Sequence, residues 1–166
     1  MRLHGKRAVA VAVATTALLA SPDASATPRA RDAVSGSGIV ELVVEGLPEP
    51  VVAAFDFGLE ARAAGHKLRG RATLEGVFVD ARVSCLEVRT IGTSPPFREA
   101  TMNVQTATFG LVTLQVSDGD SEGLPDFFSA QIPSDRTPSD CSRLPFGADN
   151  VAGFVTTGEV DLVDAT

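Results

Sequence analysis

An acidic run at residues 118–126, DGDSEGLPD, is the segment whose residue types and spacing come nearest to a metal site. Carboxylates at its first, third, fifth and ninth positions, with Gly123 at the sixth, follow part of the calcium loop of an EF-hand. Calcium binds about six to eight oxygen atoms, and carboxylates at alternating loop positions can converge on one ion. The candidate ligands are Asp118, Asp120, Glu122 and Asp126.

The same run also fits an ordinary turn between two strands. Its twelfth position, where an EF-hand has a bidentate glutamate, is Ser129, and its eighth is Pro125. The flanking segments alternate like strands and lack the period of helices. Because Asp-Gly is a common hairpin dipeptide, we favour a solvated hairpin loop and keep calcium as the alternative.

No residue is singled out as catalytic. His66 is the one histidine after residue 26, so a Ser/His/Asp hydrolase would need it as general base. The G-x-S-x-G motif is absent, and the neighbours Gly65 and Lys67 predict a surface turn. A glycosidase-type mechanism needs two acids about 5 to 10 Å apart, and the sequence does not identify such a pair. An extracellular hydrolase that uses a carboxylate pair is kept as the alternative function.

Cys85 and Cys141 are the only cysteines. In an oxidising compartment they predict a disulfide, which would close a loop of about 57 residues and contribute on the order of 4 kcal/mol. A metal pair or a catalytic thiol is the alternative, although neither has a nearby histidine. The loop around Cys141 also holds Arg136 and Arg143. Many secreted protease inhibitors present a basic side chain on such a braced loop, but an ordinary connection is the simpler interpretation.

The segments around these residues alternate with a period of two, which predicts β-strands. In residues 55–62, for example, Phe55, Phe57, Leu59 and Ala61 share one face. Turn signals separate the strands, and no amphipathic helix is evident. The prediction is an all-β fold with one disulfide, an antiparallel sandwich or flattened barrel of about eight strands. The predicted strands are 39–45, 55–62, 68–78, 81–88, 100–109, 111–117, 127–132 and 153–163, and residues 133–150 form the longest loop.

The aromatic residues are nine phenylalanines, without Trp or Tyr. Trp and Tyr are the usual anchors of interfaces and amphipathic stacking surfaces, so a sugar-binding platform is disfavoured. Phe55, Phe57, Phe78 and Phe109 could line a barrel cavity for an apolar ligand, but we expect them to fill the core.

The N-terminus has the three parts of a secretory signal peptide. Basic residues at positions 2, 6 and 7 precede a 13-residue apolar run, and the small-residue pattern Ala24-Ser25-Ala26 follows. A membrane-spanning helix needs about 20 residues, so residues 1–26 are predicted to be removed on export. Residues 27–38 are predicted to be a disordered entry segment, and residues 39–166 a single β domain. We expect a secreted, extracellular protein without a membrane anchor.

The predicted mature chain is strongly acidic. Without the signal peptide it has 11 basic and 20 acidic groups, a net charge of −9. Such a domain repels phosphate backbones, so nucleic acid is excluded as a partner. Lysine is limited to Lys6 and Lys67, while Ala, Val, Gly and Arg are abundant. This bias is typical of a bacterium with a high-GC genome.

The order of several short motifs resembles small secreted actinobacterial β-proteins grouped with post-COAP-type domains. The resemblance covers most of residues 55–166, and the turn at residues 118–123 is more acidic here than in that group. It implies the β fold, export and pairing of Cys85 with Cys141, and it implies no activity. The matching motifs are VSCLEV at 83–88, VSDGD at 116–120, PDFF at 125–128, DC at 140–141 with LP at 144–145, and TGEV at 157–160.

The expected function is therefore a secreted, non-enzymatic β domain that acts as an extracellular binding or structural module. Its partner would be an unidentified extracellular ligand or protein. No cofactor is expected apart from the alternative of calcium.

Overall fold

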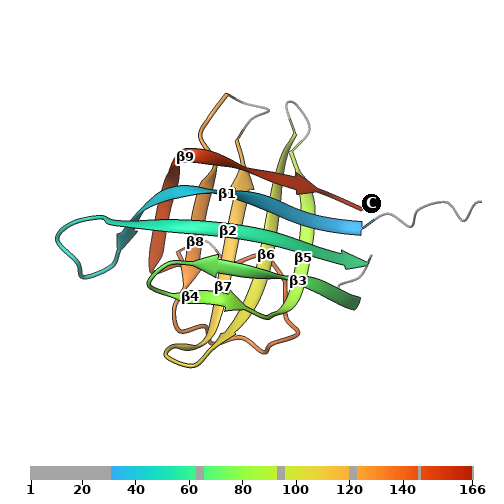
Figure 1. Cartoon of the computed structure of the whole chain (residues 1–166), viewed down its shortest axis with the longest axis horizontal. Helices are drawn as coiled ribbons and strands as arrows, with labels where there is room; N and C mark the ends of the chain where they lie inside the picture. Colours follow the sequence, from blue (N-terminus) through green and yellow to red (C-terminus); the bar gives the residue numbers. More distant parts are fainter. Residues whose placement is uncertain (1–30, 63–65, 93–95, 120–122, 146, 166) are drawn as a thin grey trace, which may run out of the picture.

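The computed structural model describes residues 31–165 apart from 63–65, 93–95, 120–122 and 146. The described residues form nine strands (Figure 1), and they include no helix long and apolar enough to cross a membrane. The strands are β1 Arg31–Val44, β2 Val51–Arg62, β3 His66–Leu74, β4 Phe78–Ala81, β5 Val83–Ile91, β6 Phe97–Thr106, β7 Gly110–Asp118, β8 Phe127–Gln131 and β9 Val151–Val163.

All nine strands belong to one antiparallel sheet in the order β4-β3-β2-β1-β9-β8-β7-β6-β5. The first four strands form one meander, the last five form another, and β9 joins the two by pairing with β1. The sheet curls into a flattened, nearly closed barrel, in which β1–β4 form a front layer that runs across β5–β8 behind it (Figure 1). The predicted all-β antiparallel fold is confirmed.

The strand count is nine because residues 68–78 are not one strand. Gly76 has a positive φ of 81°, and the Val77 amide donates to the Leu74 carbonyl oxygen at 3.0 Å. These two features close a tight turn, so β3 ends at Leu74 and the short β4 begins at Phe78. β4 and β5 are the two edges of the sheet, although they are consecutive in the chain.

The predicted disordered segment at residues 27–38 is wrong for residues 31–38, which form the first half of β1. Residues 27–30 lie outside the described residues. The glycines in this segment, which suggested disorder, allow the backbones of β1 and β9 to approach closely. A Cβ at Gly38 would lie only 1.9 Å from the carbonyl oxygen of Thr157 on β9, so the approach of the two backbones requires glycine there.

Phenylalanine rings fill the space between the two layers. The rings of Phe55, Phe57 and Phe128 pack with centroids 5.0 to 5.7 Å apart, and Phe78 is also buried. The expectation for Phe109 is wrong, because it lies in the turn after β6 and is 37% exposed. The strand ends before Phe109, so the alternation no longer directs its side chain into the core.

Two carboxylates accept hydrogen bonds from backbone amides of the edge strand β5. Asp32 accepts hydrogen bonds from the Val88 amide at 3.3 Å and from the Ala165 amide at 3.0 Å. Asp164 accepts one from the Thr90 amide at 2.8 Å. These side chains take the place of a neighbouring strand along this part of β5. Burial raises the pKa of Asp32, and the two amides that bind it oppose that effect.

Candidate binding surface

The predicted calcium ligands flank the turn between β7 and β8. Asp118 is the last residue of β7, and Asp126 precedes β8. Asp120 and Glu122 lie outside the described residues. In the part of the chain that the structure describes, there is no group of three or more His, Cys, Asp and Glu side chains placed to hold a metal ion. Calcium binding stays the alternative to the solvated hairpin loop.

Asp126 has a structural role in this turn. Its side chain is buried, and one oxygen accepts a hydrogen bond from the Gly119 amide at 3.0 Å. The other oxygen accepts one from the Val160 amide at 2.6 Å. The carboxylate therefore ties the turn to β9.

The long loop between β8 and β9 packs on the outer face of β6 and β7. Cys85 of β5 is bonded to Cys141 of the loop, which confirms the predicted disulfide. The buried Asn103 of β6 donates to the carbonyl oxygens of Asp140 at 2.8 Å and Thr137 at 3.1 Å. The side chain provides partners for loop carbonyl groups that have no strand beside them. The loop is thus a fixed part of the domain.

Of the two arginines of this loop, Arg143 holds it to the sheet and Arg136 bonds to other residues of the loop. Arg143 Nε lies 3.1 Å from Oε1 of Glu99, a buried residue of β6 whose other oxygen accepts from Gln115 at 2.7 Å. Arg136 donates to the carbonyl oxygens of Ser142 and Arg143. Burial raises the pKa of Glu99, and the Arg143 charge opposes that effect. These internal contacts argue against the protease-inhibitor interpretation.

Asp32 and Glu99, the two buried acids with raised pKa values among the described residues, do not form a glycosidase-type pair. Asp32 is on the inner side of β1, whereas Glu99 is on the outer side of β6 beneath the loop. Each is bound by protein groups at its own location. His66 begins β3 opposite Arg62, and its side chain lies outside the described part of the protein.

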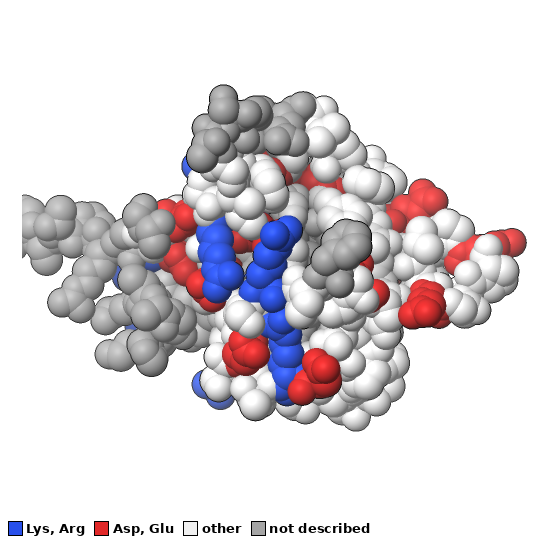
Figure 2. Space-filling model, turned by 180° about the vertical axis from the view of Figure 1, so that it is seen from behind, with Lys and Arg blue, Asp and Glu red and all other residues white. Residues whose placement is uncertain are grey.

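Two segments of the chain carry only negative charge. Residues 32–61 and 144–166 contain ten Asp and Glu and no Lys or Arg. They form most of β1 and β2 and all of β9, which are neighbours in the sheet. Basic side chains gather on the rear face, while the projecting β1–β2 hairpin, at the right of that view, shows acidic ones (Figure 2). The arginines in ion pairs with Asp or Glu are Arg31, Arg71, Arg89, Arg98, Arg136 and Arg143.

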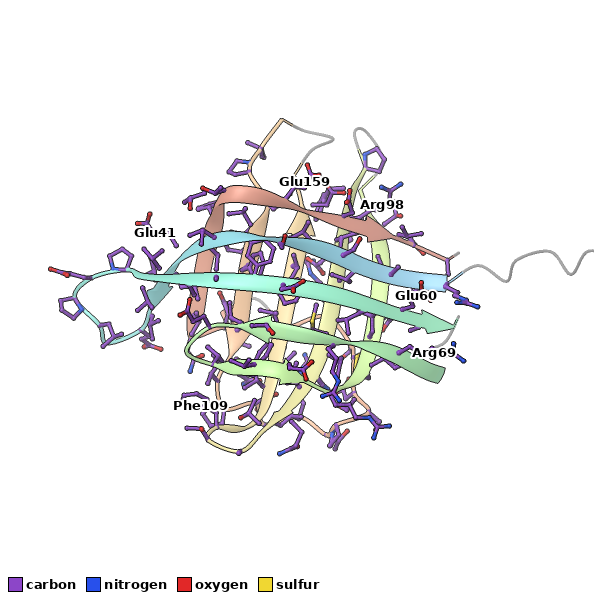
Figure 3. The ribbon with its side chains drawn as sticks, viewed as in Figure 1. Glu41, Glu60, Arg69, Arg98, Phe109 and Glu159 are labelled. Atoms are coloured by element: carbon purple, nitrogen blue, oxygen red, sulfur yellow. A yellow bond between two sulfur atoms is a disulfide. The ribbon has the colours of Figure 1, made fainter. Side chains whose placement is uncertain are left out.

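Three exposed apolar side chains surround a glutamate at the base of this hairpin. Val52 of β2 and Phe154 of β9 lie opposite Glu41 on the strands either side of β1. Val43 follows on the same face of β1. The exposed fractions are 67% for Val52, 52% for Phe154 and 61% for Val43. We call these four residues the hairpin face, and Figure 3 shows Glu41 at the hairpin end of β1.

The tip of the hairpin extends this acidic and apolar surface. Residues 45–50 carry Glu45 and Glu49 beside Leu47, which is 54% exposed. Within residues 31–165 as described, neither of these acids nor Glu41 belongs to an ion pair. Exposed apolar groups beside unpaired carboxylates suit a partner that brings both apolar groups and positive charge.

A shallow hollow of about 370 Å³ lies further along the outer side of β2. A Cβ at Gly58 would meet no atom within 4 Å, so packing does not require glycine there, and the missing side chain leaves the hollow open. Arg71 donates to the Asp80 carbonyl oxygen at 2.6 Å and lies 3.5 Å from the Asp80 carboxylate. The hollow is lined by Asp56, Gly58, Gly70, Arg71, Thr73 and Asp80.

Sequence reasoning missed both the hairpin face and the hollow, although each leaves a trace. The consecutive apolar residues Leu42, Val43 and Val44 break the alternation, which places one apolar side chain on the outside of the strand. Gly58 similarly interrupts the outward row of acids between Asp56 and Glu60.

Comparisons of the chain with protein-family models, with curated proteins and with solved structures gave no match. The resemblance to post-COAP-type proteins stays a prediction.

Proposed function

We propose that this protein is a secreted, non-enzymatic β domain that binds a cationic protein outside the cell through the hairpin face. The N-terminal signal pattern supports export. The Cys85–Cys141 disulfide supports it too, because such bonds persist in oxidising compartments.

The observation that carries the proposal is the hairpin face itself. Single exposed apolar residues are normal on a protein surface, but Val43, Val52 and Phe154 are grouped around one carboxylate. Covering one such side chain fully contributes about 1.5 to 3 kcal/mol. Three of them give a docking surface of useful strength, even though part of that energy is lost on association.

The charge around the hairpin face defines the chemistry of the partner. Glu41, Glu45 and Glu49 lie on a part of the chain without basic residues. A cationic partner is attracted to this surface, whereas an acidic one is repelled. A second copy of this chain is a poor match, because six of its arginines are already paired with its own acids.

A defined peptide pair tests this function. The probe is a fluorescent octapeptide of alternating lysine and valine, and its control has glutamate in place of lysine. We expect residues 27–166 to bind the lysine peptide and not the glutamate peptide. Phe154→Ser should raise the Kd for the lysine peptide about tenfold, the equivalent of roughly 1.4 kcal/mol. The matched control is Phe109→Ser, since Phe109 is also an exposed phenylalanine but lies in the β6–β7 turn.

Two results would contradict the proposal. One is equal binding of the lysine and glutamate peptides, and the other is equal loss of affinity in the Phe154 and Phe109 variants. Export has its own check: the N-terminus of the protein recovered from the culture medium should be Thr27. Retention of the uncleaved chain in the cytoplasm would contradict that part.

A further inference from the structure

The hollow on β2 lies on the same side of the sheet as the hairpin face. Val52, Ala54, Asp56 and Gly58 are alternate residues of β2, so their side chains point outward together. None of these four residues has a long side chain. They form a shallow track from the apolar end of the face to the hollow, and Figure 3 shows Glu41 and Glu60 toward opposite ends of this side.

The charge in the hollow favours a positive group. The positive charge of Arg71 is balanced by Asp80, with which it forms a hydrogen bond and an ion pair. Asp56 has no ion pair among the described residues, so the lining carries one uncompensated negative charge. Gly58 leaves room for a side chain of the partner, because a Cβ at this position would have no neighbour within 4 Å. The chain has an ordinary φ at Gly58, unlike at Gly70, so backbone conformation does not explain the glycine.

We infer that the partner binds as an extended segment with two anchors, an apolar side chain on the hairpin face and a Lys or Arg side chain in the hollow beside Asp56. This inference rests on the proposed function and adds the geometry of recognition. At about 3.3 Å per residue, Val52 is roughly 13 Å from Asp56 and 20 Å from Gly58 along β2. An extended partner has the same rise, so its basic residue stands about four to six positions from its apolar anchor.

A spacing series of peptides tests this geometry. Each peptide has one leucine and one lysine in a neutral Ser/Gln background, separated by two, five or nine positions, in both chain directions. We expect the five-position peptide to bind tightest in one direction, about fivefold or more above the peptide with norleucine in place of lysine. Gly58→Val occupies part of the hollow, since a Cβ there meets no atom within 4 Å, and it should reduce the affinity of the five-position peptide to that of the norleucine peptide.

Two further variants test the anchor for the basic side chain, one at the site and one as a control. Asp56→Asn should reproduce the effect of Gly58→Val, whereas Asp135→Asn, which removes one exposed charge in the β8–β9 loop, should leave the Kd within twofold. Equal affinity at all spacings, together with no effect of Gly58→Val, would overturn the two-anchor geometry. If Phe154→Ser still raised the Kd of the lysine–valine probe about tenfold in that case, the proposed function would stand. Failure of every peptide, including the alternating lysine–valine probe, would overturn both.

Discussion

Glu41 of β1 lies opposite Phe154 of β9, so a carboxylate stands beside an aromatic ring that is 52% exposed to solvent. The two residues are far apart in the chain, and the pairing of β1 with β9 joins the two halves of the barrel. The ring is not isolated, because Phe127 of β8 packs against it with centroids 5.0 Å apart. This contact fixes the ring in place and limits the entropy lost on binding.

Reversing the charge at Glu41 should weaken peptide binding and leave the stability of the fold nearly unchanged. Glu41→Lys should weaken binding of the lysine–valine octapeptide about tenfold and reduce its dependence on salt. Stability should change by no more than about 0.5 kcal/mol, because the side chain is exposed. Fluorescence anisotropy and urea unfolding measure the two effects. Asp135→Lys is the control on another surface, and an equal loss of binding in both variants would indicate unspecific charge attraction.

Replacing Asp126 should destabilise the domain. The Asp126 carboxylate accepts hydrogen bonds from the backbone amides of Gly119 and Val160. In Asp126→Asn, an NH₂ group replaces one of the two accepting oxygens, so one of these hydrogen bonds is lost. Loss of a buried charge-assisted hydrogen bond costs about 1 to 3 kcal/mol. Urea unfolding should show this loss, while Asp161→Asn on an exposed site of β9 should show little change. A change below about 0.5 kcal/mol for Asp126→Asn would contradict the structural role of this carboxylate.

Much of the fold could be predicted from local pattern. The alternation of apolar residues was sufficient to predict an antiparallel all-β fold, and the two cysteines were sufficient to predict the disulfide. The start of β1 was missed because Gly38 reflects close contact with Thr157, a residue more than a hundred positions away. The hairpin face was missed for the same reason, since the register that places Val52 and Phe154 beside Glu41 is a property of three strands together.

Reduction of the disulfide should lower stability without unfolding the barrel. Cys85 and Cys141 are separated by 56 positions, and closing such a loop contributes on the order of 4 kcal/mol. The Cys85→Ala/Cys141→Ala variant should therefore unfold at lower urea and be cleaved faster within the β8–β9 loop, which loses its covalent link to β5. Limited proteolysis followed by mass spectrometry locates the cuts. Equal urea midpoints for the variant and the oxidised protein would contradict this prediction.

Asp32 should make the domain less stable as pH rises through the weakly acidic range. Its pKa in the folded protein is raised above the ordinary value of 3.8. The folded state then holds the proton more tightly than the unfolded chain. The contribution is fully present below pH 3.8 and is lost as pH rises through the folded pKa. The stability of the wild type relative to Asp32→Asn should fall from about pH 4 to pH 7 in urea unfolding. If the stability of the wild type relative to Asp32→Asn rose over this interval, the pKa of Asp32 in the folded protein would be lowered.

Calcium should not stabilise the domain, because the Asp126 carboxylate already serves the amides of Gly119 and Val160. Thermal melts of residues 27–166 in millimolar calcium and in chelator should coincide. Binding at about 100 times the Kd would add about 2.7 kcal/mol and move the midpoint by several degrees. Such a shift, lost in Asp118→Asn/Asp120→Asn, would restore the acidic turn as an ion site.

Amide chemical shifts during a titration of isotope-labelled residues 27–166 with the lysine–valine octapeptide locate the binding surface residue by residue. We predict saturable shifts at Glu41, Val43, Val52 and Phe154, and none at Phe109 in the β6–β7 turn. Shifts centred on β5 around Arg89, or unsaturable shifts spread over all exposed acids, would contradict binding through the hairpin face.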